Sequence, residues 1–371
     1  MNKCLVTRLN GSVHDSSLLR LSEMRIRFDK VVSTTEHAQA FKLGAVKPIQ
    51  LEIVGDGYFT DKTLTQNLGK TKTISSDEEI WVSNGAEIAI LDKYSLMRIN
   101  KLYSDNITFN ISDLKYSTAL ADLRLYDTQL GSDIANLKNL IALTDLYLYN
   151  TQVSGDIANL KNLTSLRNLY LYNTQVSGDI ANLKNLTSVS DLYLYNTQVS
   201  GDIANLKDLT TVRNLSLENT QVSGDIANLK NLTALTSLSL SNKQQPLTGD
   251  ISQLSVLSNC TRIILSYSKL SGDLAILPSE CRFTSFYEDK GSVFTWSTRT
   301  STAKIIAIEG NAKITNIDKM LQDQAQCQIG FSSNDDVRFK TISALGTRTS
   351  ASDAAVQTLQ KKGYTVSVTP A

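Results

Sequence analysis

The chain has 371 residues, of which 41% are hydrophobic, so it is long enough for two or three domains or for one extended repeat array. Its 37 basic residues balance 36 acidic ones, and a net charge of +1 cannot supply the counterion release that drives nucleic-acid binding. We therefore expect no nucleic-acid partner and no attraction to an anionic membrane surface.

No targeting or membrane-spanning segment is expected. The opening MNKCLVTRLNGSV lacks the apolar run of a secretory signal. No stretch approaches about 18 consecutive apolar residues, which argues against membrane insertion. This predicts cytoplasmic synthesis, and association with a virion would fit as well, because a virion leaves its host by lysis.

The sequence carries no signature of an enzyme. GxSxG, P-loop and HExxH motifs are absent, and His14 and His37 leave little from which to build a triad or a zinc site. The four cysteines are too scattered for a disulfide framework and are expected to be reduced thiols. We therefore predict a non-enzymatic protein with no cofactor and no metal.

Residues 1–105 form the first predicted domain, a β-rich one. Apolar residues alternate over 24–28 and 49–53, and Ser-Asn-Gly at 83–85 between IWV and EIAI indicates a tight hairpin. The opening, with LLRLSEMRI and LEIVGDGYFT, is similar to the leading segment of proteins encoded by phages and prophages of gut bacteria. The resemblance implies a docking domain whose partner is a virion assembly.

A 23-residue repeat fills residues 106–286. Its apolar spacing, LxxLxLx4Vx3IxxLxxL, suits neither a lone helix nor a lone strand, but it suits one turn of a coil in which LxL is a short strand with both leucines inward. A seventh copy starts at Ile263 after 25 residues, because 243–247 carries two additional residues. The evenly spaced first leucines are Leu123, Leu146, Leu169, Leu192, Leu215 and Leu238.

A glycine and an aspartate mark the turn of each copy. Gly178 allows a backbone conformation that a residue with a Cβ resists. Asp179 is expected to cap the short helical turn of IANL by accepting backbone N–H bonds. Stacked carboxylates repel one another. We expect the capping bonds to offset this repulsion together with a lysine column, which comprises Lys138, Lys161, Lys184, Lys207 and Lys230. We therefore interpret the aspartates as helix caps rather than as a metal site. The aspartate column is Asp133, Asp156, Asp179, Asp202, Asp225, Asp250 and Asp273.

The unit LTSLRNLYLYNTQVSGDIANLKN resembles the plant-type leucine-rich repeat, whose pattern is LxxLxxLxLxxN followed by LxGxIP. Thr174 and its equivalents stand where that family has an inward asparagine joining successive coils, and alanine replaces the proline. Threonine can still donate one hydrogen bond. The resemblance implies an α/β solenoid, in which a curved parallel leucine-rich-repeat sheet presents its inner face to a partner.

Residues that flank the inward leucines should line the concave face, because side chains alternate along a strand. Strands about 4.8 Å apart would place tyrosine rings in two ladders, and tyrosine is favoured in recognition surfaces. The alternative is that duplicated copies inherited rings that only stabilise the sheet by cross-strand stacking. The predicted ligand-binding residues are Arg124, Tyr126, Tyr147, Tyr149, Tyr170, Tyr172, Tyr193, Tyr195 and Glu218.

Residues 287–371 are predicted to form a C-terminal α/β cap. KIIAIEG is typical of a strand, ITNIDKMLQDQ of an amphipathic helix, and SASDAAVQTLQKKGYTVSV of a capped helix that ends at Gly363 before a final strand. Alternation of strand and helix is typical of a parallel sheet. Such a cap would continue the solenoid sheet and cover its edge.

These features predict a binding module that presents the concave face to a glycan or protein receptor, as a phage tail or receptor-binding component would. One alternative is a structural or assembly protein of a virion with the solenoid as a spacer. Another is a bacterial effector delivered into host cells. Serine substitution of the tyrosines separates the first two, because only a binding module would lose attachment.

Overall fold

The computed structural model describes residues 111–286, 291–310, 313–332 and 337–370, together with the backbone of the strands that precede residue 111. The chain divides into two compact units, residues 1–155 and 156–371, and each is described by itself. In the described part no helix is both long and apolar enough to cross a membrane.

The first unit begins with two sets of antiparallel strands. One sheet has the order β5-β3-β7-β1-β9, and in the other β2 pairs with β6 and β8 while β4 pairs with β6. Strand β8 then pairs in parallel with the first repeat strand. The strands are β1 (Met24–Phe28), β2 (Ala38–Ala45), β3 (Ile49–Val54), β4 (Tyr58–Phe59), β5 (Thr71–Ile74), β6 (Glu78–Ser83), β7 (Glu87–Ile90), β8 (Ile99–Ser104) and β9 (Ile107–Thr108).

The hairpin predicted around residues 83–85 is wrong. Strand β6 pairs with β2 and β4, whereas β7 pairs with β1 and β3, so the two strands belong to different sheets. Each strand finds a partner distant in sequence instead of its neighbour. The turn residues 84–86 themselves lie outside the described part of the chain.

The first unit also contains the first repeat coils. Strand β10 (Asp122–Arg124) pairs in parallel with β11 (Asp145–Tyr147), and Leu123 lies opposite Leu146. Two 3₁₀ helices accompany them, η1 (Ile111–Tyr116) and η2 (Ile134–Leu137).

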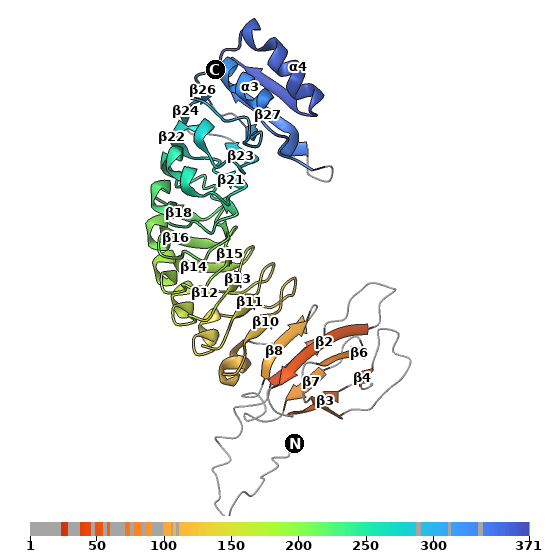
Figure 1. Cartoon of the computed structure of the whole chain (residues 1–371). Coiled ribbons are helices and arrows are strands. Elements are labelled where there is room, and N and C mark those ends of the chain that lie inside the picture. The colour runs from red at the N-terminus through yellow and green to blue at the C-terminus, as the bar shows by residue number, and fades with distance from the viewer. Residues whose placement is uncertain are drawn as a thin grey trace, which may run out of the picture. The chain divides into compact units, whose positions relative to one another are not determined.

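In the second unit the repeats stack as parallel strands in register, with Leu169, Leu192, Leu215, Leu238 and Ile263 aligned. Figure 1 shows the strands following one another through this unit. A second row of strands, β14, β16 and β18, forms a separate parallel sheet. The elements are β12 (Ser154–Asp156), η3 (Ile157–Leu160), β13 (Asn168–Tyr170), β14 (Gln175–Asp179), η4 (Ile180–Leu183), β15 (Asp191–Tyr193), β16 (Gln198–Asp202), η5 (Ile203–Leu206), β17 (Asn214–Ser216), β18 (Gln221–Ser223), η6 (Ile226–Leu229), β19 (Ser237–Ser239), β20 (Thr248–Asp250), η7 (Ile251–Val256), β21 (Arg262–Ile264), β22 (Lys269–Asp273), η8 (Leu274–Ile276) and β23 (Phe283–Phe286).

The predicted interior of each coil is confirmed. Leu169 and Leu171 are both 0% exposed, and the remaining apolar positions of the repeat are buried in the same way. Removing a side chain of this size from water stabilises the fold by about 2 kcal/mol. The solenoid core is therefore a continuous column of leucine, isoleucine and valine beneath the strands.

The predicted turn chemistry is confirmed as well. Asp179 accepts a hydrogen bond from the backbone N–H of Ala181 at 2.7 Å, and Gly178 has a φ of +107°. All seven aspartates of the column cap a 3₁₀ helix in this way. In the described ion pairs, however, no lysine of the expected column pairs with these aspartates. The cap is the bond that all seven share, and Asp273 also accepts from the Ser297 backbone N–H at 3.2 Å.

Two polar features of the coils were not predicted. Asn173, Asn196 and Asn219 adopt a positive φ, and their exposed amides form a ladder in which each donates to the one before, at 2.6 and 2.8 Å. Thr174 donates to the carbonyl of Leu171 in its own coil and does not connect coils. Asn242 does connect them, because its side chain donates to Val222 O and accepts from Thr220 N.

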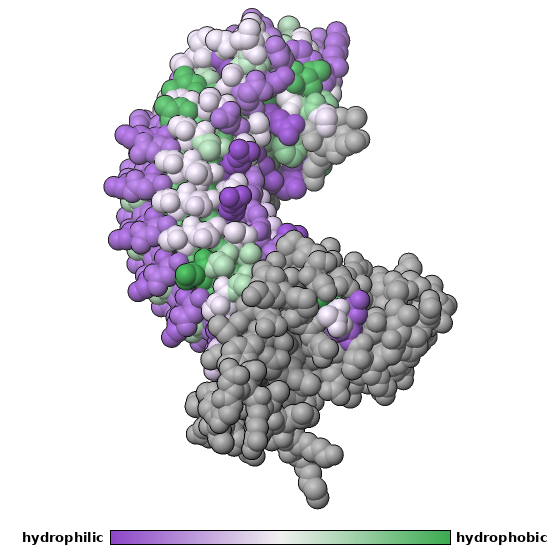
Figure 2. Space-filling view, turned by 60° about the horizontal axis from the view of Figure 1, so that its bottom comes forward, coloured by the Kyte–Doolittle hydropathy of each residue, from purple (hydrophilic) through white to green (hydrophobic). Residues whose placement is uncertain are grey.

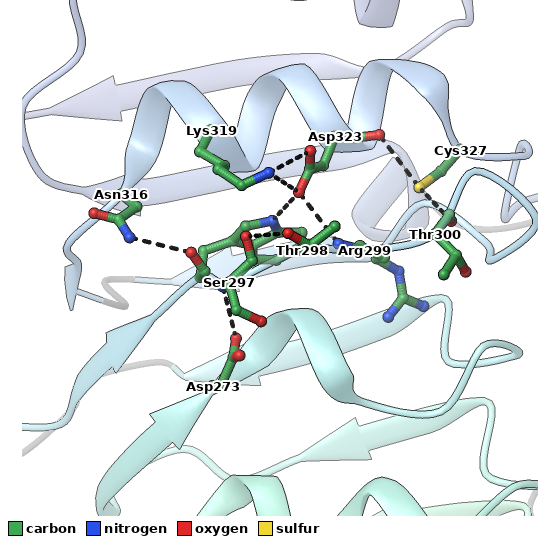
Figure 3. Close-up of polar contacts among 10 residues, drawn as sticks. Asp273, Ser297, Thr298, Arg299, Thr300, Asn316, Lys319, Asp323 and Cys327 are labelled. Carbon is green, nitrogen blue, oxygen red and sulfur yellow. Dashed lines mark hydrogen bonds and ion pairs between the residues drawn. The ribbon is translucent and has the colours of Figure 1, made fainter.

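The C-terminal segment extends the parallel sheet in the order β23-β25-β27-β28. Helix α3 buries Ile317, Met320 and Leu321, and its Asp323 accepts from the Trp296 indole N–H at 3.0 Å and from the Arg299 backbone N–H at 3.2 Å (Figure 3). The elements are β24 (Val293–Thr295), β25 (Ala307–Gly310), β26 (Lys313–Ile314), α3 (Ile317–Gln326), η9 (Val337–Lys340), β27 (Thr341–Leu345), η10 (Ser350–Ser352), α4 (Asp353–Lys361) and β28 (Thr365–Thr369).

Candidate binding surface

Four tyrosines of the second unit lie in two ring stacks on the same face of the sheet. The rings of Tyr170 and Tyr193 stack with centroids 4.6 Å apart, and those of Tyr172 and Tyr195 stack at 4.3 Å. All four side chains are half-buried. We call these four residues the tyrosine strip. It exists because the inward leucines turn every alternate side chain of the strand outward.

The phenols of Tyr193 and Tyr195 keep their protons at ordinary pH. Burial is the largest cause that raises the pKa of Tyr193, and the Asp191 carboxylate adds to it. Burial also raises the pKa of Tyr195, and the Glu218 carboxylate contributes in the same direction. A raised pKa keeps the proton on the hydroxyl, so the strip offers ring edges and hydroxyl groups rather than charge.

In the first unit, the four predicted residues Arg124, Tyr126, Tyr147 and Tyr149 also meet in pairs. Tyr126 and Tyr149 stack at 4.6 Å with their planes 6° apart. The Arg124 guanidinium lies 4.7 Å from the centre of the Tyr147 ring and pairs with Asp122 at 2.9 Å. The arginine is thus held against a ring and by a carboxylate, which orients it.

Glu218, the ninth predicted residue, lies where the tyrosine columns end. Its carboxylate accepts hydrogen bonds from the hydroxyls of Ser216 and Ser239. Nearby, Asp191 accepts from the Asn214 amide. The sequence analysis did not anticipate that these two serines hold a carboxylate. The signal was present, since the three residues occupy flanking positions of two successive LxL strands.

Two pockets of the described part of the chain lie away from the strip. A pocket of about 350 Å³ is lined by Arg282, Lys304 and Phe331 among others, and one of about 240 Å³ includes Leu277 and Arg299, so neither contains a predicted site residue. Within the described residues no cluster of His, Cys, Asp or Glu could hold a metal ion. The face drawn in Figure 2 is mostly hydrophilic or near neutral over its described part, with strongly apolar residues only in small separate patches. Half-buried rings and hydroxyls outside these pockets suit an extended ligand better than an enclosed small molecule.

Two thiols lie inside the coils that follow the strip. Cys260 and Cys281 are both 0% exposed, and burial raises the pKa of Cys260 to about 12 and that of Cys281 to about 11. Cys260 takes the place that Val189 and Val212 occupy in earlier repeats. It is therefore a core residue and not a reactive thiol.

We expect alkaline pH to destabilise the chain through Cys260. An unfolded thiol ionises near pH 8.5. The contribution of the Cys260 thiol to the free energy of unfolding is therefore complete below that pH, and it is lost as the pH rises toward the folded pKa. Between pH 8.5 and 10.5 the free energy of unfolding of the native chain should fall by roughly 2 to 3 kcal/mol more than that of the Cys260→Val variant. Urea unfolding in reductant at several pH values measures the difference, and identical pH profiles for the two chains would contradict it.

Comparisons with known proteins bear on the fold. No family model and no curated protein matches the chain. Among solved structures, an internalin (inlF) from Listeria monocytogenes is 23% identical with a TM-score of 0.53, over 76% of this chain and 83% of that one. The leucine-rich-repeat ectodomain of the Arabidopsis receptor kinase HAESA, in complex with a peptide hormone ligand, is 22% identical with a TM-score of 0.50, over 69% of this chain but only 42% of that one. These likenesses, the parallel register and the buried leucines together establish that the chain has the leucine-rich-repeat solenoid fold.

Proposed function

We propose that the chain is a non-enzymatic binding module whose tyrosine strip receives an extended segment of a partner protein. The observation that carries the proposal is that the rings are ordered where the scaffold does not require them. In the same columns, Ser216 and Ser239 replace tyrosine, and the register of the strands continues unchanged. Rings that the core does not need are available to a ligand.

The stacking favours a protein segment over a glycan. Each ring of the strip has one face against another ring, at 4.3 to 4.6 Å, so the strip presents mainly edges and hydroxyls along its length and leaves a ring face uncovered by tyrosine only where the columns end. Ring edges are electropositive and hydroxyls donate and accept hydrogen bonds, which suits peptide carbonyls and amides. Sugars, by contrast, pack their C–H groups on ring faces. The peptide ligand of the HAESA ectodomain is consistent with this choice.

Serine substitution of the whole strip tests the proposal. Linear peptides of 12 residues are first selected from a displayed library on the native chain. The variant with Tyr170, Tyr172, Tyr193 and Tyr195 replaced by serine should then bind the selected peptides at least about tenfold more weakly, because buried tyrosines dominate binding energy in such contacts. Fluorescence anisotropy of labelled peptides gives the dissociation constants.

The matched control keeps the strip and changes the separate sheet. Gln175→Ser with Gln198→Ser removes two exposed side chains from β14 and β16 in the same coils and should leave peptide affinity unchanged. Equal peptide binding by the strip variant and the native chain would instead favour tyrosines that serve only sheet stability. A glycan array run in parallel would contradict the choice of ligand if it alone gave binding that depends on the strip.

Docking of the N-terminal domain to a virion assembly, as in a phage tail component, stays a prediction from the sequence. Delivery into host cells as a bacterial effector also stays a prediction from the sequence. The two solved structures bear on neither a virion role nor an effector role.

A further inference from the structure

We propose that the end of the tyrosine strip binds a cationic side chain, a lysine ammonium or an arginine guanidinium, of the partner segment. The inference rests on the proposed function and names the chemistry that the strip recognises. The site is the place where the ring columns give way to small hydroxyl side chains beside a carboxylate. We call it the serine step, and it comprises Tyr193, Tyr195, Ser216, Glu218, Ser239 and Ser241.

The first step of the argument is that each ring column ends here. Tyr193 stacks on Tyr170, and its partner in register on the following strand is Ser216. Tyr195 stacks on Tyr172, and the next coil carries Glu218 in that column, as the hydrogen bond from Asn196 N to Glu218 O at 2.8 Å confirms. One face of each terminal ring is therefore not covered by another tyrosine. A ring face is electronegative and attracts a cation.

The second step is that a fixed carboxylate stands beside those faces. Glu218 is held from two sides by the hydroxyls of Ser216 and Ser239, each of which donates to a different carboxylate oxygen. A carboxylate has about four acceptor sites. The two serines use two of them, so Glu218 retains acceptor capacity for an ammonium or guanidinium. Its orientation is set before any ligand arrives, which lowers the entropic cost of binding.

The third step is the balance of charge. Burial is the largest cause that raises the pKa of Tyr193; Asp191 raises it further, Arg262 lowers it, and Glu218 raises it by less than Arg262 lowers it. The Arg262 guanidinium lies 5.8 Å from the centre of the Phe283 ring. Arg262 and Phe283 are register partners at the first position of their strands, whereas Tyr193 and Ser216 occupy the third position of theirs. Asp191 and Glu218 bring two negative charges to this end of the strip and Arg262 brings one positive charge, so the carboxylates favour a cationic ligand over an anionic one.

The fourth step concerns Ser241, one coil beyond Glu218 in the same column. Its side chain is 7% exposed, and its hydroxyl oxygen has no hydrogen-bond partner. A buried hydroxyl without a partner is uncommon in folded proteins and costs stability. Ser241 is therefore an unsatisfied polar group one coil beyond the carboxylate.

A charge-matched pair of small probes tests the inference. With ¹³C-labelled tyrosine rings assigned by single Tyr→Phe changes, tert-butylammonium and its neutral isostere tert-butanol are titrated at low salt. The ammonium should shift the Tyr193 and Tyr195 ring signals saturably, and the alcohol should need at least about fivefold higher concentration. Glu218→Gln, which keeps the side-chain volume, should weaken ammonium binding by about five- to tenfold.

The control is Asp208→Asn, which removes the same unit of charge at an exposed position where Asn162, Asn185 and Asn231 stand in other repeats. It should leave the titration unchanged. Equal shifts from ammonium and alcohol, or ammonium binding unaffected by Glu218→Gln, would overturn the inference. If selected peptides still require the strip while the ammonium fails, the proposed function stands and this inference falls. If the peptides do not require the strip, the proposed function itself fails.

Discussion

Replacing Arg299 with methionine is expected to lower the free energy of unfolding by about 3 to 5 kcal/mol. Arg299 is only 4% exposed, and burial lowers its pKa below the ordinary value of arginine. Its guanidinium donates to six carbonyl oxygens, at distances between 2.9 and 3.4 Å. The acceptors are Ala275, Leu277, Pro278, Ser279, Cys281 and Lys304.

The reason for so large an effect is the segment that Arg299 holds. Five of the six carbonyls belong to residues 275–281, in η8 and in the segment that connects it to β23. Pro278 O and Ser279 O also accept backbone N–H bonds, whereas methionine would remove the guanidinium donors from the carbonyls of Ala275, Leu277 and Cys281. Figure 3 shows the arginine below α3, whose Asp323 accepts the Arg299 backbone N–H. Arg299→Lys should also destabilise the chain, because an ammonium carries three donors where the planar guanidinium carries five.

Urea unfolding followed by circular dichroism gives the stability change, and amide hydrogen exchange over 274–286 locates it. Arg213→Met is the matched control, since Arg213 is exposed, and it should change stability by less than about 0.5 kcal/mol. A loss below about 1 kcal/mol for Arg299→Met, or exchange that rises elsewhere and not in this segment, would show that the carbonyls do not depend on Arg299.

Gly178→Ala is expected to cost about 2 to 4 kcal/mol. Gly178 has a φ of +107°, and an added Cβ would lie 2.1 Å from Oδ1 of Asp156, far inside van der Waals contact. That oxygen accepts the capping bond from Ala158 N at 2.7 Å. The substitution therefore strains one coil and displaces the N-cap of the coil before it.

Gly291→Ala separates the two contributions. Gly291 has a φ of +109°, but an added Cβ there would meet nothing within 4 Å. The stability lost in Gly291→Ala should reflect backbone strain alone, about 1 to 3 kcal/mol. It should be smaller than the stability lost in Gly178→Ala by about the contribution of one N-cap hydrogen bond. Thermal unfolding of both variants measures this, and losses of equal size would mean that the aspartate moves aside without cost.

Much of the solenoid could be predicted because its determinants are local and are repeated. Asp179 caps the turn that begins at the next residue, and Gly178 adopts the backbone that its missing Cβ permits, so neither depends on distant partners. The leucine spacing likewise specifies which side chains face inward, and Leu169 is fully buried. The tyrosine columns followed from strand alternation alone.

What could not be predicted depends on residues far apart in the sequence. The sequence aligns Asn242 with the exposed Asn196, yet in this coil, which carries two additional residues, Asn242 is buried and bonds Val222 and Thr220 of the preceding coil. Strands β6 and β7, close in sequence, were expected to pair and instead join separate sheets. The hydroxyls that hold Glu218 come from two different coils.

The sequence by itself determined the period, the inward leucines, the caps and the outward rings, since each follows from short-range geometry copied at a constant interval. Only the tertiary structure decided how Glu218 is oriented, which carbonyls Arg299 serves and which strands of the first unit pair. Those arrangements depend on which groups meet after the coils have stacked. A buried donor or a sheet edge is satisfied by whatever partner packing brings within reach, and no local pattern specifies that partner.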